Sequence, residues 1–347
     1  MLWAVGGLFA VDGLVFRTGW YAGWMHPDSS TGHYERLIVH EREQSKAGGK
    51  RVLVLGDSRT GFLARVADER TAGRIRFGNA ALGGTTPRCW YYLLRDMDPR
   101  ANAYAAIVVP FGHYEDEEAV DDLRNRTGDL HFLAERLRLT DAPAFVSSVS
   151  SLQAHVQTVR ALLWKGFLYN RDVQDLLRSP ARRAQTIETY RNWAEWVYGY
   201  QGEARSLEGL QVDYPRRKIT FPAGLDERAR AELVEALLWE PFEPKGWMYE
   251  YRMEWIGKIA ERYRGTGTKL IFMRLPRGPV PRPVEWGRAK TSAVREIAKR
   301  EGAVLAPEGL FEELEQPRLF VDGRHLNSAG MTRFSELIAD LVLGQGL

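Results

Sequence analysis

Two short motifs near opposite ends of this 347-residue chain contain residue types suited to acyl transfer. Ser58 ends the tripeptide Gly-Asp-Ser after an apolar run, and Asp322 stands three residues before His325. A serine hydroxyl is a weak nucleophile until a neighbouring base takes its proton. Histidine can act as that base, and a carboxylate in the same loop can fix its tautomer and stabilise the imidazolium. Each motif alone is common, but together they predict a catalytic triad of Ser58, His325 and Asp322.

The elements around these motifs predict an α/β domain with a parallel sheet. The apolar run at 51–56 is rich in Val and Leu, which is typical of a buried strand. We expect further strands at 74–81, 105–110, 269–276 and 303–307. Helical patterns separate them, and this alternation favours a doubly wound sheet. Ligands bind outside the carboxyl ends of such strands. Ser58 directly follows the first run, so we expect its hydroxyl to face a cleft.

The alternation of strands and helices stops at about residue 116, and the chain becomes mostly helical until about residue 264. This insertion holds much of the Trp and Tyr of the chain, for instance in the stretch TYRNWAEWVYGY. Aromatic rings of this kind either fill a helical core or stack on sugar rings. Because the insertion leaves the domain directly after its third strand, we expect it to cover or extend the cleft. The predicted divisions are 1–24, a linker at 25–50, an α/β domain at 51–115 and 265–347, and a helical insertion at 116–264.

The first 16 residues are apolar except for Asp12, and Trp20, Tyr21 and Trp24 follow them. A membrane span needs about 20 apolar residues, and aromatic residues are enriched at membrane interfaces. No small-residue cleavage site follows the apolar stretch. The pattern favours a membrane anchor or uncleaved signal at residues 1–24, with the remainder outside the cytoplasm. The alternative is the first helix of a soluble domain.

The composition of the chain argues against several classes of function. The formal net charge is +3, with acidic and basic residues mixed along the chain, which argues against a nucleic-acid partner. Cys89 is the single cysteine, so no intramolecular disulfide can form. Neither zinc-ligand spacing nor a phosphate-binding glycine motif occurs in the sequence. We therefore expect neither a metal nor a cofactor.

Three segments in order, GDS at 56–58, NAALGGTT at 79–86 and DGRHLNSAG at 322–330, resemble the SGNH/GDSL hydrolase superfamily. The resemblance implies a flavodoxin-like three-layer α/β/α domain. It also implies Ser58 as nucleophile and Asp322 with His325 as the activating pair. The backbone N–H groups of Ser58 and Gly84 would form the oxyanion hole.

The sequence departs from the family pattern in three places. Arg59 stands where the family often has leucine, and Ala81 stands where a glycine is usual. The family also has a conserved block after the third strand, here called the third block, which reads Gly112-His113-Tyr114-Glu115, with Tyr114 at the position of the usual asparagine. That asparagine would donate a hydrogen bond to the oxyanion, and losing one such donor typically costs about 10²–10³ in rate. We expect His113 or Tyr114 to replace it, and slow selective deacylation or acyl transfer rather than fast general hydrolysis.

The N-terminal stretch, the altered third block and the insertion together resemble the membrane-anchored branch of the superfamily. Members of that branch work beside membrane-bound O-acyltransferases in alginate acetylation and teichoic acid D-alanylation. The resemblance implies an extracytoplasmic esterase or O-acyltransferase acting on acyl, most simply acetyl, esters of a cell-surface glycan. Two alternatives stay open: a non-catalytic scaffold that binds a glycan or a membrane acyltransferase, and a soluble cytoplasmic esterase.

Overall fold

The computed structural model describes residues 2–117, 122–238, 246–281 and 289–347. Contacts divide the chain into two compact units, each built from several segments. Unit 1 comprises Met1–Gln44, Arg88–Pro99 and Asp121–Val197, and unit 2 comprises Ser45–Pro87, Arg100–Val120 and Tyr198–Leu347. This division differs from the predicted one, because the insertion contributes its first part to unit 1 and its second part to unit 2.

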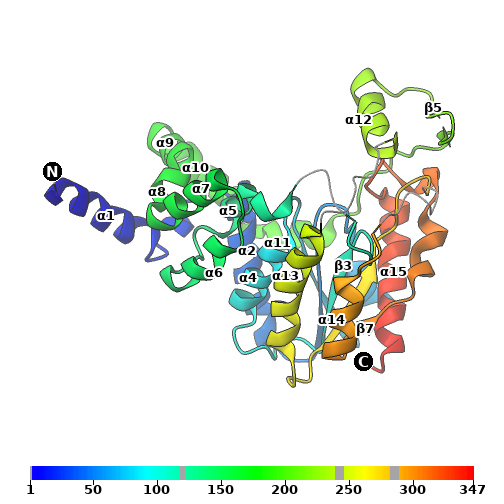
Figure 1. Cartoon of the computed structure of the whole chain (residues 1–347), viewed down its shortest axis with the longest axis horizontal. Coiled ribbons are helices and arrows are strands. Elements are labelled where there is room, and N and C mark those ends of the chain that lie inside the picture. Colours follow the sequence, from blue (N-terminus) through cyan, green and yellow to red (C-terminus); the bar gives the residue numbers. More distant parts are fainter. Residues whose placement is uncertain (1, 118–121, 239–245, 282–288) are drawn as a thin grey trace. The chain divides into compact units, whose positions relative to one another are not determined.

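Unit 2 is built on a five-stranded parallel sheet with the order β2-β1-β3-β6-β7 (Figure 1). The predicted α/β class with a parallel sheet is therefore confirmed. The strands are β1 (Lys50–Gly56), β2 (Ile75–Ala81), β3 (Ala106–Phe111), β6 (Lys269–Arg274) and β7 (Val304–Leu305).

The sheet is buried on both faces, as its continuous apolar runs require. Alternate strand residues such as Val52, Val108 and Ile271 point into one large core, which α3 and α15 cover. Helices α13 and α14 pack together and contact β6 and β7 respectively. The helices of this unit are α3 (Ala64–Arg70), α12 (Glu227–Leu238), α13 (Trp247–Tyr263), α14 (Ala293–Glu301) and α15 (Ser328–Gly344).

The second part of the insertion is not purely helical. It contains an antiparallel hairpin of β4 (Gln211–Asp213) and β5 (Lys218–Thr220). Its long helix α13 buries one face rich in Trp, Tyr and Ile in unit 2, including the fully buried Trp255. At least these aromatic residues are core residues.

Unit 1 is helical. The predicted linker at 25–50 contains a full helix, α2, whose residues Tyr34, Leu37 and Ile38 are buried. The helices that start in this unit, or at its edge, are α1 (Leu2–Phe16), α2 (Ser30–Gln44), α4 (Pro87–Met97), α5 (Leu130–Leu133), α6 (Ala142–Ser147), α7 (Leu152–Leu163), α8 (Lys165–Leu168), α9 (Asn170–Arg178), α10 (Pro180–Thr189) and α11 (Trp193–Gly199).

The N-terminal apolar stretch forms α1, which has 15 residues. Within the described ranges, no helix has both the length and the apolar character to cross a membrane. Asp12 is buried and accepts hydrogen bonds from the backbone N–H groups of Lys165 and Gly166 at 3.3 and 2.7 Å. Phe16 and Tyr21 lie in a small core with Tyr169. The second half of the segment 1–24 is thus part of the packing of unit 1, and its role as a membrane anchor stays a prediction.

Candidate active site

Ser58 stands in the turn that follows β1, and its side chain is exposed. The turn depends on Gly56, which has φ 153°, and a Cβ there would lie 2.0 Å from Oγ1 of Thr60. Only glycine fits both the backbone angle and this contact. The N–H of Thr60 donates to the carbonyl of Asp57 at 3.0 Å and closes the turn. The serine is therefore held at the carboxyl end of a central strand, where the sequence predicts it.

His325 reaches Ser58 from a loop directly before α15. Its Nε2 lies 3.0 Å from Oγ of Ser58, and its Nδ1 lies 2.8 Å from Oδ2 of Asp322. The loop is braced by the N–H of Val321, which donates to the His325 carbonyl at 3.0 Å. The Asn327 side chain accepts from the N–H of Gly330 at 3.0 Å and caps α15. The structure thus joins the three residues of the predicted triad in one hydrogen-bonded chain.

Asp322 is held as an anion. Its Oδ1 accepts the backbone N–H groups of Arg324 and His325, both at 2.8 Å. Burial raises the pKa of this carboxyl, but the hydrogen bonds from His325 and Arg324 and the charge of the imidazole outweigh burial, so the pKa lies below its ordinary value. An ionised Asp322 bonded to Nδ1 leaves Nε2 of His325 free to accept the Ser58 proton.

The loop after β2 borders Ser58 on a second side. A Cβ at Gly83 would lie 3.6 Å from Cβ of Ser58, and Gly84 has φ 79°. Thr85 ties this loop to the end of β1, because its hydroxyl lies 2.9 Å from the Gly56 carbonyl. Among the residues that the structure describes, no acceptor takes the backbone N–H of Ser58 or Gly84. Both amides are therefore available to an oxyanion, as the resemblance implies.

Asn79, the first residue of the second block, has a structural role. Its side-chain amide donates to the Phe62 carbonyl at 2.7 Å, and its oxygen accepts the N–H of Ala81 at 2.9 Å. It thus ties the end of β2 to the chain segment that leads into α3.

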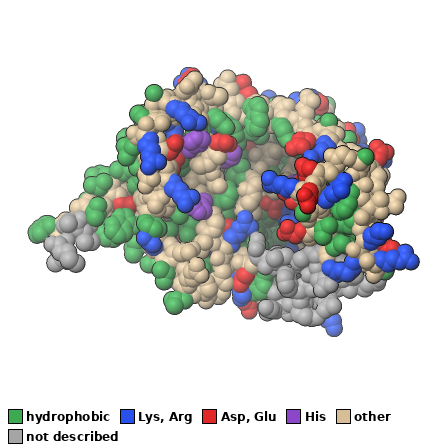
Figure 2. Space-filling model, turned by 90° about the horizontal axis from the view of Figure 1, so that it is seen from above, with side chains coloured by type: hydrophobic (Ala, Val, Ile, Leu, Met, Phe, Trp, Pro, Cys, Tyr) green, Lys and Arg blue, Asp and Glu red, His purple; other side chains and the backbone are tan. Residues whose placement is uncertain are grey.

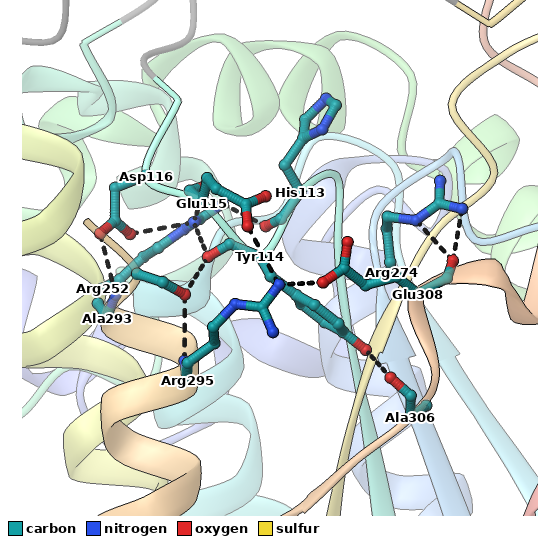
Figure 3. Close-up of polar contacts among 11 residues, drawn as sticks. His113, Tyr114, Glu115, Asp116, Arg252, Arg274, Ala293, Arg295, Ala306 and Glu308 are labelled. Carbon is teal, nitrogen blue, oxygen red and sulfur yellow. Dashed lines mark hydrogen bonds and ion pairs between the residues drawn. The ribbon is translucent and has the colours of Figure 1, made fainter. Parts of the chain in front are cut away.

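The third block, after β3, departs from the expectation. Tyr114 is fully buried, and its hydroxyl lies 2.8 Å from the Ala306 carbonyl and 3.2 Å from the Phe272 carbonyl (Figure 3). Burial raises the pKa of this phenol. Tyr114 therefore does not replace the missing oxyanion donor, and that prediction is wrong. The physical reason is that apolar packing inside the domain stabilises the phenol ring, while backbone carbonyls there accept the hydrogen bond of its hydroxyl.

The backbone of the third block is held by Arg252, a buried residue of α13. Its guanidinium donates to the carbonyls of His113 and Glu115 at 3.1 and 2.7 Å and pairs with Asp116 at 3.1 Å (Figure 3). Asp116 also accepts the N–H of Ala293 at 2.9 Å, at the start of α14. No sequence pattern linked Arg252 to this block, because it lies far away in the insertion.

His113 is partly exposed and contacts Glu117, with 3.4 Å between Nε2 and Oε2. In the part of the chain that is described, no hydrogen bond joins His113 to Ser58. An oxyanion donor contacts the substrate oxygen, so the predicted role of His113 stays a prediction.

Arg59 directly follows the nucleophile and forms a bidentate ion pair with Asp57. Its Nη2 lies 2.7 Å from Oδ2, and its Nε lies 3.1 Å from Oδ1. Burial raises the pKa of Asp57, but Arg59 outweighs this and holds it below its ordinary value. The sequence marks Arg59 only as a departure from the family pattern, without a role.

The second part of the insertion lies against the loop that carries Asp322 and His325. A Cβ at Gly323 would lie 2.6 Å from Cβ of Ala236 on α12. The carbonyl of Glu203 accepts the N–H of Ser328 at 2.7 Å, at the start of α15. The insertion thus supports the acid–base loop.

Within the described ranges, no three His, Cys, Asp or Glu side chains gather in an arrangement that could hold a metal ion. A cleft of about 960 Å³ lies in unit 1 and is lined by residues of that unit alone, among them Arg17, Glu135 and Lys165. Compared with known proteins, the chain matches no protein-family model and no characterised protein.

Proposed function

We propose that this protein is an SGNH-type serine esterase or O-acyltransferase that acts on acyl esters of a cell-surface glycan outside the cytoplasm. The observation that carries the proposal is the hydrogen-bonded chain from Ser58 through His325 to Asp322, with 3.0 and 2.8 Å between the bonded atoms. The lengths of both hydrogen bonds are within the range required for general-base activation of a nucleophile.

The order and spacing of the triad support the SGNH type over other serine hydrolases. α/β-Hydrolases carry the serine in a G-x-S-x-G turn, whereas residues 56–60 here read Gly-Asp-Ser-Arg-Thr, with Thr60 in place of the second glycine. Asp322 and His325 share one loop just before the last helix. A five-stranded parallel sheet with helices on both faces is compatible with the flavodoxin-like three-layer domain that this type implies.

The chemistry follows from the positions of the groups. Oγ of Ser58 attacks the acyl carbonyl carbon while Nε2 of His325 takes the hydroxyl proton, and the N–H groups of Ser58 and Gly84 bind the developing oxyanion. His325 then returns the proton to the departing alcohol, which leaves the acyl group on Ser58. Water or a glycan hydroxyl repeats the sequence in reverse and removes the acyl group. A membrane-bound O-acyltransferase is the proposed partner that supplies or receives acyl groups.

Unit 1 supports a location at a membrane surface. α1 buries its charged residue Asp12 and exposes Leu8, Val11 and Leu14 by 54–68%. Hydrophobic side chains consequently gather along α1, at the left of Figure 2.

Helix α7 extends this apolar surface. Trp164, which directly follows α7, stacks on Phe9 of α1 with 5.2 Å between the ring centroids. On α7, exposed apolar residues recur at intervals of four, three and four residues and form one stripe: Leu152, Val156, Val159 and Leu163. Trp20 and Trp24 are exposed after α1, and rings of this kind favour the membrane interface. We infer that α1 and α7 lie in the interface of a lipid bilayer.

A fluorophosphonate probe tests the chemistry without knowledge of the substrate. We expect a covalent adduct on Ser58, located by mass spectrometry of the digested protein, and no adduct in the variant Ser58→Ala. A folded wild-type protein that acquires no adduct would refute the proposed activity.

Flotation with lipid vesicles tests the location. Wild-type protein should float with vesicles that contain anionic lipid, and Val156→Glu with Val159→Glu should weaken flotation. Val234→Glu, at an exposed apolar position of unit 2, is the matched control and should not change flotation. Equal flotation of all three proteins, or of none, would exclude the α1 and α7 surface as the membrane contact.

A further inference from the structure

The site has two backbone donors for an oxyanion but lacks a side-chain donor at the third block. Tyr114, at the position of the usual asparagine, points into the domain. His113 has no hydrogen bond to Ser58 within the described residues. With Tyr114 turned away, another donor can serve this side of the site, and Arg59 beside Ser58 is one that an ion pair holds in place.

Arg59 fills this side of the site. One edge of its guanidinium, formed by Nε and Nη2, is bound to Asp57. The other terminal nitrogen, Nη1, points toward the third block, since a Cβ at Gly112 would lie 3.2 Å from it. Among the described residues no acceptor takes the hydrogens of Nη1, and the side chain is 44% exposed, so a substrate can reach it.

Two features hold the guanidinium in this orientation. The pair with Asp57 fixes the side chain next to the turn that carries Ser58, and a planar fork bound at two points loses little further freedom on binding a ligand. Gly112 leaves room for Nη1, because any side chain there would press on it.

We propose that Arg59 is the third oxyanion donor of this site, with Nη1–H in place of the family asparagine. This inference rests on the proposed function. When Oγ of Ser58 bonds to the carbonyl carbon, the carbonyl π electrons move to the oxygen, and the Ser58 proton moves to Nε2 of His325. Nη1–H, together with the N–H groups of Ser58 and Gly84, binds that negatively charged oxygen. Its donation is charge-assisted, so it is stronger than that of a neutral amide.

The test measures the rate of Ser58 acylation with p-nitrophenyl acetate and with the fluorophosphonate probe. Arg59→Met keeps an unbranched stem but removes the guanidinium donor, and we expect acylation to fall by about 10²-fold. Arg59→Lys keeps the charge near Asp57 without the fork, and we expect a smaller fall. Added guanidinium chloride at millimolar concentration should restore part of the rate in Arg59→Met and none in Ser58→Ala.

The charge left on Asp57 needs its own control, because an unpaired carboxylate near the site would also slow the reaction. The double variant Asp57→Asn with Arg59→Met removes both charges. If Nη1 is the donor, the double variant stays as slow as Arg59→Met, and recovery of the wild-type rate would overturn the proposal. Gly112→Ala crowds Nη1 while it keeps both charges, and it should lower kcat more than it changes KM.

The outcomes separate this inference from the proposed function. A Ser58 adduct in wild type with a slow, guanidinium-rescued Arg59→Met supports both. A Ser58 adduct with Arg59→Met within about threefold of the wild-type rate overturns the role of Arg59 and leaves the esterase intact. The absence of any Ser58 adduct in folded wild type overturns both. Circular dichroism and the melting temperature establish that each variant is folded.

Discussion

The two units differ in which side chains they expose. In unit 2 a large apolar core lies between the sheet and helices α3 and α15, and the reactive groups Ser58 and His325 stand in open loops. Unit 1 also buries apolar side chains, among them Leu93, Phe132 and Leu133. Both units bury ion pairs, Arg88 with Asp129 in unit 1 and Arg252 with Asp116 in unit 2. On the outside of unit 1, α1 and α7 expose apolar stripes.

The difference shows what each unit is suited to do. An apolar interior with its strand ends open holds a few polar groups rigidly for chemistry. A unit with an apolar outside has a surface that water solvates poorly, which favours contact with a membrane. Buried ion pairs add little net stability but are costly to break. Catalysis should therefore respond to changes in the loops of unit 2, and stability to changes in buried charges such as those of unit 1.

The largest effect is expected in unit 2. Ser58→Ala should lower the rate of ester hydrolysis by at least about 10⁴-fold, because the three residues of a triad act together and the loss of one disables the others. The melting temperature should not fall, since the Ser58 side chain is exposed. Steady-state kinetics with p-nitrophenyl acetate and a thermal melt measure both. Retention of wild-type activity would show that the triad is not used.

Next in size is the loss of an ion pair inside unit 1. Arg88 is fully buried, with its Nε 2.8 Å from Asp129, and its Nη1 and Nη2 donate to Ser148 and the Arg126 carbonyl. Arg88→Met leaves Asp129 buried without its partner, so the free energy of unfolding should fall by about 3–5 kcal/mol. Urea unfolding followed by tryptophan fluorescence measures this change.

Arg228→Met is the matched control for that substitution. Arg228 pairs with Glu232 on the surface of α12 in unit 2, and such pairs contribute at most about 1 kcal/mol. If both substitutions changed the free energy of unfolding equally, the buried pair would contribute no more than an exposed pair.

A pH dependence of intermediate size is expected from unit 1. Burial raises the pKa of Glu135 from 4.5 to about 7, and burial lowers the pKa of Lys165 from 10.5 to about 8. For Glu135 the stability is full below pH 4.5 and is lost as the pH rises through 7. For Lys165 it is full above pH 10.5 and is lost as the pH falls through 8. The free energy of unfolding should therefore be lowest near pH 7–8.

Glu135→Gln isolates the carboxyl contribution. Since one pKa unit corresponds to about 1.4 kcal/mol, this variant should remove a loss on the order of 2–3 kcal/mol between pH 5 and 7.5. Urea unfolding at several pH values measures it in both proteins. Identical slopes in the two proteins would show that Glu135 is charged throughout this range.

The smallest effect concerns the third block. Tyr114→Phe removes a buried hydroxyl that bonds to carbonyls of Ala306 and Phe272, and it should lower the free energy of unfolding by about 1 kcal/mol. The hydrolysis rate should stay within twofold of wild type, because the phenol does not face Ser58. A large fall in kcat with unchanged stability would instead indicate that Tyr114 donates a hydrogen bond to the oxyanion.

The sequence by itself determined the parallel sheet and the positions of the reactive residues. Strands β1, β2, β3 and β6 lie within a residue or two of their apolar runs, because a strand buried on both faces must be apolar throughout. Ser58 and His325 could be placed because each directly follows or precedes such an element, and strand ends of a parallel sheet share one edge.

Only the tertiary structure decided where the other polar side chains found their partners. Asp12 interrupts an apolar stretch in the sequence, yet it lies buried because the start of α8 offers it two backbone donors. Tyr114 lies inside the domain, and Arg252 of the insertion donates to the backbone of the loop that contains Tyr114. Such choices depend on groups that are distant in the chain, since a buried polar group must find a partner wherever the fold supplies one. Local patterns contain no information about those partners.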